Sequence, residues 1–148
     1  MTAEDHTTNV PISVLTREAL NEISLAGLRG WLLSTLDGRW LASSIDGDRN
    51  AAAAVMASAH SLATRTGSLL GSGEVHAHLV HTEDGIVASK LVRKDAVLTL
   101  LVDDSSNMAQ VLHASRRAAE LLSKNDRLPV STEPLVPLPD RPKLSVAS

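Results

Sequence analysis

Apolar side chains along the first third of the chain change from a helical to a strand spacing. From Leu15 to Ile23 they recur at every fourth position among charged neighbours, which predicts a short amphipathic helix. Residues 28–36 and 39–45 instead follow a strand pattern, and Asp37-Gly38 between them supplies the positive-φ residue of a tight hairpin turn. The chain is therefore predicted to begin with a helix followed by a β-hairpin.

A long helix is predicted for residues 50–70, which contain no proline and many good helix formers. Asp48 precedes this segment as a candidate N-cap, and Gly71 follows it as a helix-ending residue. Three further strands are predicted at residues 74–81, 86–93 and 96–102. Because the connections between these strands are short, neighbouring strands must run antiparallel.

The strand at residues 96–102 is apolar at nearly every position, which is typical of a central strand covered on both faces. A final amphipathic helix follows, with a cap within residues 105–107 and an apolar stripe from Met108 to Leu122. Together these elements predict an α+β fold, a five-stranded antiparallel sheet with helices on both faces.

Composition divides the chain into three parts. Residues 1–12 are predicted to be a flexible N-terminal tail, and residues 13–123 a single domain. Five of the six prolines fall within the last 20 residues, so residues 124–148 are predicted to be a Pro-rich disordered tail. This tail has two P-x-x-P spacings that could bind an aromatic groove, although a solvated tail is the simpler interpretation.

The long helix at residues 50–70 has two faces of different character. On a wheel of 100° per residue, the face with the larger apolar side chains is predicted to pack on the sheet. It carries Val55, Ala59, Leu62, Thr66 and Leu69, flanked by Met56, Ala63 and Leu70. The adjoining arc has small side chains, and the only full charge between residues 50 and 70 is Arg65.

Small side chains permit close helix approach, so this arc is predicted to contact a second subunit in a homodimer. The arc consists of Ala53, Ala57, His60, Thr64 and Gly67. The alternative is an alanine-rich face exposed to water. The strand at residues 74–81, with Val75, Ala77 and Leu79 alternating along it, has no proline or lysine to protect an edge, and could pair with its own copy.

Composition and charge narrow the range of chemistry. The apolar fraction is 43% and the only aromatic residues are two tryptophans, so aliphatic side chains must fill the core. The absence of cysteine excludes disulfides, thiolate metal sites and cysteine nucleophiles. With a net charge of -3 the chain has no broad electropositive surface, so nucleic acid is not an expected partner.

The N-terminal residues 1–11 lack the basic and apolar regions of a signal peptide. No segment has about 18 uninterrupted apolar residues. We therefore expect a cytoplasmic protein without membrane insertion.

Candidate catalytic and ligand-binding patterns are weak. His76 and His78 share a strand face and could chelate zinc or copper together with carboxylates or His81. Half-exposed strand histidines are the favoured interpretation, so no metal is predicted. The glycines between Gly67 and Gly73 follow a helix and precede a strand, the reverse of a phosphate loop, and the lysine is missing. No catalytic residue, cofactor or enzymatic activity is predicted.

The segment from Leu28 to Ser44 with its Asp-Gly turn, the alanine-rich helix ending near Gly71, and residues 98–102 and 107–122 resemble the roadblock/dynein-light-chain family. This family is related to the longin and profilin-like folds. The resemblance implies a homodimer formed through the long helix and the strand after it. In bacteria, it further implies regulation or scaffolding of a Ras-like small GTPase.

Few lysines and abundant alanine and arginine suggest a GC-rich bacterial genome, which favours the bacterial setting. The sequence is therefore interpreted as a non-enzymatic homodimeric adaptor of a small GTPase in a signalling system. The alternative is a small-molecule-sensing α+β domain, because related folds bind ligands between sheet and helix.

Overall fold

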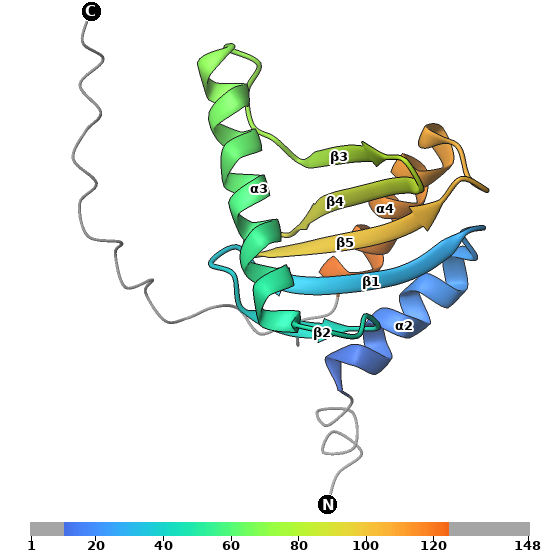
Figure 1. Ribbon diagram of the computed structural model, residues 1–148. Coiled ribbons are helices and arrows are strands. Elements are labelled where there is room, and N and C mark those ends of the chain that lie inside the picture. Colours follow the sequence, from blue (N-terminus) through green and yellow to red (C-terminus); the bar gives the residue numbers. More distant parts are fainter. Residues whose placement is uncertain (1–10, 125–148) are drawn as a thin grey trace, which may run out of the picture.

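The computed structural model describes residues 11–124 (Figure 1). The flexible tail predicted for residues 1–12 and the Pro-rich tail predicted for residues 124–148 lie outside this range, except for the residues that border it. The elements are α2 (Ile12–Ile23), β1 (Leu28–Thr35), β2 (Trp40–Ser43), α3 (Arg49–Leu69), β3 (Ala77–Thr82), β4 (Gly85–Val92), β5 (Ala96–Asp103) and α4 (Met108–Ser123). All predicted helices and strands are present, in the predicted order.

The five strands form one antiparallel sheet in the order β2-β1-β5-β4-β3. The apolar strand β5 is central, as its sequence predicts, and β3 lies at one edge. Leu98 and Leu100 of β5 and Leu33 of β1 are completely buried. The predicted five-stranded sheet is therefore confirmed.

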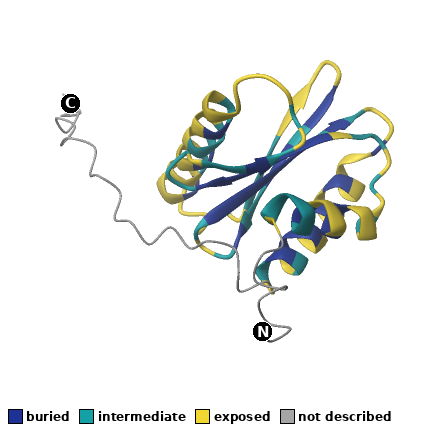
Figure 2. Ribbon diagram, turned by 90° about the horizontal axis from the view of Figure 1, so that it is seen from below, coloured by how far each residue is buried: buried dark blue, intermediate teal, exposed yellow. Residues whose placement is uncertain are grey.

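Helices cover both faces of this sheet (Figures 1 and 2). On one face, α2 and α4 enclose the main apolar core, which includes Trp31, Leu98, Val111 and Leu122. On the other face α3 crosses the strands alone, from β2 toward β3, and its C-terminal end projects past β3 (Figure 1). The predicted arrangement with helices on both faces is confirmed.

Local capping explains where the two long helices begin. The side chain of Asp48 accepts a hydrogen bond of 3.0 Å from the Ala51 amide at the start of α3, as predicted. At the start of α4, Asn107 accepts from the Gln110 amide while the Gln110 side chain accepts from the Asn107 amide. Each cap satisfies backbone donors that have no partner within the helix.

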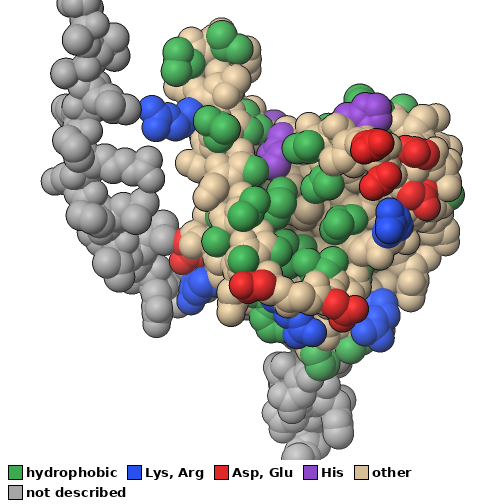
Figure 3. Space-filling view, viewed as in Figure 1, with side chains coloured by type: hydrophobic (Ala, Val, Ile, Leu, Met, Phe, Trp, Pro, Cys, Tyr) green, Lys and Arg blue, Asp and Glu red, His purple; other side chains and the backbone are tan. Residues whose placement is uncertain are grey.

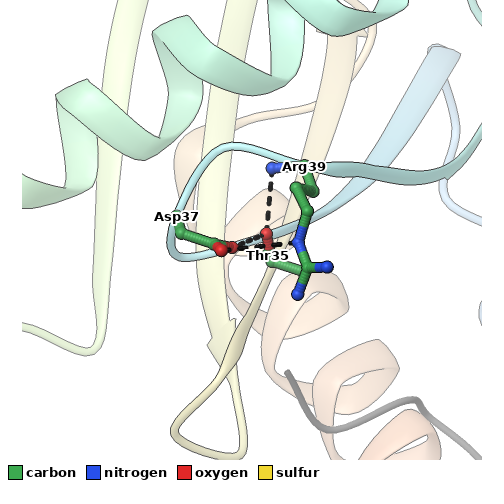
Figure 4. A network of polar contacts seen from close by, with 3 residues as sticks. All are labelled: Thr35, Asp37 and Arg39. Atoms are coloured by element: carbon green, nitrogen blue, oxygen red, sulfur yellow. Dashed lines mark hydrogen bonds and ion pairs between the residues drawn. The ribbon is translucent and has the colours of Figure 1, made fainter. Parts of the chain in front are cut away.

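The predicted hairpin turn between β1 and β2 is held by a polar network (Figure 4). The Thr35 hydroxyl donates to Asp37 and accepts from the Arg39 amide at 2.9 Å, and Arg39 Nε lies 3.4 Å from an Asp37 carboxylate oxygen. Gly38 has a φ of +88°, and a Cβ atom there would lie 3.3 Å from Ala54 Cα. The glycine thus allows α3 to rest directly on the turn.

Candidate interaction face

The buried residues of α3 are Ala53, His60 and Gly67, and they recur every seventh position along the helix. This line belongs to the small-residue arc that the sequence predicts to face a second subunit. In the structure it faces the chain's own sheet. The predicted orientation of the helix is therefore wrong, because the arc expected to point outward is covered from within the chain.

Close backbone approach explains why the small residues point inward. A Cβ atom at Gly67 would lie 2.7 Å from the carbonyl oxygen of Gly73 and 3.0 Å from Val75 Cγ2. At the other end of the helix, a Cβ atom at Gly38 would lie 3.7 Å from Ala57 Cβ, and Ala57 is half-buried. Small side chains are needed here for intrachain contact. Thr64, the remaining residue of the arc, is exposed.

The large apolar side chains of α3 point to the outside. Val55 is 62% exposed, Leu62 68%, Leu69 80%, and Leu70, just after the helix, 72%. Leu62 is two positions from His60, which at 100° per residue places it on nearly the opposite side of the helix. The prediction that Val55, Leu62 and Leu69 pack on the sheet is therefore wrong.

A groove of about 530 Å³ has α3 on one side and, on the other, β3 with the connection that precedes it. Apolar side chains dominate its lining, and they include Leu62, Ala63, Leu70, Val75, Ala77 and Val80. Figure 3 shows apolar side chains gathered along α3 and over the neighbouring sheet surface. We call this groove, together with exposed Val55 and Leu69, the α3–β3 face.

The three strand residues predicted at an interface have different positions. Val75 lies in the connection before β3, because the strand begins at Ala77 and the connection turns back over Gly67. Val75 and Ala77 line the groove, whereas Leu79 packs against the main core on the opposite face of the sheet. Contact of any of these residues with a second copy remains a prediction.

Leu70 and Val80 belong to the α3–β3 face but are absent from the predicted interface. Alternation along β3 could have predicted that Val80 lies on this face, since it is two positions from His78 and therefore points to the same side of the strand. The seven-residue spacing of Ala53, His60 and Gly67 could have indicated the buried side of α3, because residues seven positions apart lie on the same side of a helix.

A pair of histidines lies beneath the α3–β3 face. The ring centroids of His60 on α3 and His78 on β3 are 5.9 Å apart. Burial lowers the pKa of His60, and burial together with the nearby His60 charge lowers the pKa of His78. Both rings are therefore favoured in the neutral form at pH 7.

The Roadblock/LC7 domain family model matches residues 17–102, which is more than half of the chain. This chain belongs to the Roadblock/LC7 family. A search of curated proteins finds no match.

Solved structures show the same fold. The chain is similar to the gliding protein MglB of Thermus thermophilus, with a TM-score of 0.66 and 21% identity over 75% of this chain and 87% of that one. For Myxococcus xanthus MglB the TM-score is 0.67 with 16% identity over 84% and 91% of the two chains. A Roadblock/LC7 domain from Streptomyces avermitilis gives 0.66 with 16% identity over 75% and 93%.

The described part of this Roadblock/LC7 chain contains no group of three or more His, Asp or Glu side chains that could hold a metal ion. His76, which the sequence offers as a ligand with His78, lies before β3 and is exposed. Across residues 11–124, no helix combines the length and the apolar character needed to cross a membrane.

Proposed function

We propose that this chain forms a homodimer through the α3–β3 face and that the dimer is a non-enzymatic regulator of a Ras-like small GTPase in a bacterial signalling system. The observation that carries this proposal is the row of outward apolar side chains on α3, Val55, Leu62 and Leu69, which are between 62% and 80% exposed. A contiguous apolar patch of this kind is typical of a protein interaction site.

The neighbouring edge of the sheet supports self-association. Strand β3 pairs with β4 on one side only, and neither proline nor lysine interrupts Ala77–Thr82. Its outer backbone groups are available to a second strand. Antiparallel pairing of two β3 strands about a two-fold axis would keep both α3 helices on the same side of a joined sheet, so their apolar stripes would meet.

Family membership supports the same proposal. One MglB structure similar to this chain, with a TM-score of 0.66 and 23% identity, is described as having a tetrameric arrangement. Association with copies of itself therefore occurs on this fold. A protein can regulate a GTPase by binding it, without contributing a catalytic group, so the proposed dimer needs only a surface outside its subunit contact that fits the GTPase.

The first test is the mass of the full chain by sedimentation equilibrium, with a dimer expected at pH 7.5. Leu62→Glu would place a charge within the proposed contact and should give a monomer. Leu112→Glu is the matched control, because Leu112 is an exposed leucine on α4, on the other side of the sheet. A monomeric wild-type chain, or dissociation by both substitutions alike, would overturn the dimer.

The second test uses small GTPases encoded near this gene, mixed with the wild-type chain and with Leu62→Glu. We expect co-elution with one of them and a changed rate of GTP hydrolysis or nucleotide exchange, both reduced by the substitution. No binding and no kinetic effect with any of them would contradict a regulatory role. A metabolite that raised the Tm of the chain strongly would instead favour the small-molecule-sensing alternative.

A further inference from the structure

A row of polar side chains crosses the sheet on the face that α3 covers. His78 on β3 is in register with Ser89 on β4, which is in register with Thr99 on β5. Residues in register share one face of the sheet, and His60 of α3 lies against this row through its contact with His78. His60 is only 8% exposed. The imidazole pair therefore connects the helix to the edge strand.

The polar atoms of this row are not equally satisfied. The hydroxyls of Ser89 and Thr99 bond one another at 3.0 Å and are buried. Nε2 of His78 is also buried, yet within the described residues it has no hydrogen-bond partner. Protonation of that nitrogen would create a buried, charged donor without an acceptor, which is costly in free energy.

No carboxylate compensates a positive charge at this position within residues 11–124. Burial is the cause that lowers the pKa of His60, and for His78 the only charge that contributes is that of His60. On β3 and β4, alternation places His81 and Lys90 on the opposite face of the sheet. The other titratable side chains of the neighbouring segments are Arg49, Arg65, Glu74 and His76, all exposed, and Asp103 at the far end of β5.

We call the packing contact between α3 and β3 the seam. We infer that the His60–His78 contact makes the seam sensitive to pH, and with it self-association through the α3–β3 face. The seam is closed while both rings are neutral and loosens when they are protonated. The effect on self-association rests on the proposed function, whereas the effect on the seam does not. Both elements of the α3–β3 face meet at this contact, so its loosening would alter the groove between them.

The direction and size of the effect follow from linkage. A histidine whose folded pKa is lowered contributes stability that is complete above its ordinary pKa of about 6.5 and is lost as the pH falls below that value. At pH 5.5 a freely exposed imidazole is about tenfold more often charged than neutral. Closure of the seam should therefore weaken at pH 5.5 by up to about tenfold for each proton that the closed seam excludes.

The seam is tested by NMR titration of the imidazole protons of the full chain from pH 8 to 5. We expect His60 and His78 to titrate below the ordinary imidazole pKa of about 6.5. Substitution of His60 by glutamine should raise the pKa of His78, because it removes the nearby His60 charge. Amide protection in the C-terminal half of α3 should fall between pH 7.5 and 5.5. Titration of His60 and His78 at or above the ordinary imidazole pKa of about 6.5 would overturn the inference, and this result needs no variant.

Self-association is tested by sedimentation at pH 7.5 and 5.5. The wild-type dissociation constant should be higher at pH 5.5 than at pH 7.5, and so should that of the control His81→Gln. The double variant His60→Gln/His78→Gln should change much less. An equal pH dependence in the double variant would refute control by this pair. A chain that is monomeric at both pH values would refute the dimer, while titration and amide exchange would still decide the seam.

Discussion

Substituting alanine for Leu62 removes the central side chain of the outward stripe on α3. Full burial of a leucine side chain contributes about 1.5–3 kcal/mol. Leu62 is 68% exposed in the single chain, so its burial by a partner would contribute about 1–2 kcal/mol. In a symmetric dimer both copies lose this contribution, about 2–4 kcal/mol in total, which corresponds to a roughly 30-fold to 700-fold rise in the dissociation constant.

Sedimentation equilibrium over a range of concentrations measures this change directly. Leu112→Ala on α4 serves as the matched control, since Leu112 is 38% exposed and lies on the helix covering the opposite sheet face. The control should leave the dissociation constant within a factor of about two. Circular dichroism of both variants should match the wild-type chain, because neither position is part of the core.

A dissociation constant unchanged by Leu62→Ala would refute the assignment of the α3–β3 face, even if the chain were dimeric. In that case the leucines on α3 would be solvated and the dimer would use another surface. Comparable weakening by Leu112→Ala would point to α4 instead. Only selective weakening by Leu62→Ala agrees with the orientation of α3 described above.

Two further substitutions test how α3 is held. Gly67→Ala should lower the free energy of unfolding, measured by urea denaturation, by about 1–3 kcal/mol. The reason is that its Cβ would lie 2.7 Å from the Gly73 carbonyl oxygen. Ser68→Ala, at an exposed neighbouring position, is the control and should have little effect. An unchanged midpoint for Gly67→Ala would mean that the connection moves aside freely. Asp48→Ala removes the cap on the Ala51 amide and should lower the free energy of unfolding by about 1 kcal/mol, which is measured as a lower Tm. An equal Tm for the variant and the wild-type chain would show that another group caps the helix.

The order and type of the elements could be predicted from local sequence patterns. Alternation and the Asp37-Gly38 turn located the hairpin, and Asp48 located the start of α3. The nearly continuous apolar run of β5 placed it at the centre of the sheet. These features depend on neighbours within a few positions, where side-chain spacing and backbone preference act directly. The resemblance to the roadblock family rested on the same patterns and is confirmed by the family match.

The interaction face could not be predicted in this way. The sequence determined that α3 has a large apolar arc and a small one, but helix periodicity alone does not say which arc the sheet receives. The tertiary structure decided it, because the Gly38 turn and the connection after Gly67 approach the helix too closely for leucine. Only the small arc fits there, so Leu62 and its neighbours face outward and His60 meets His78 inside.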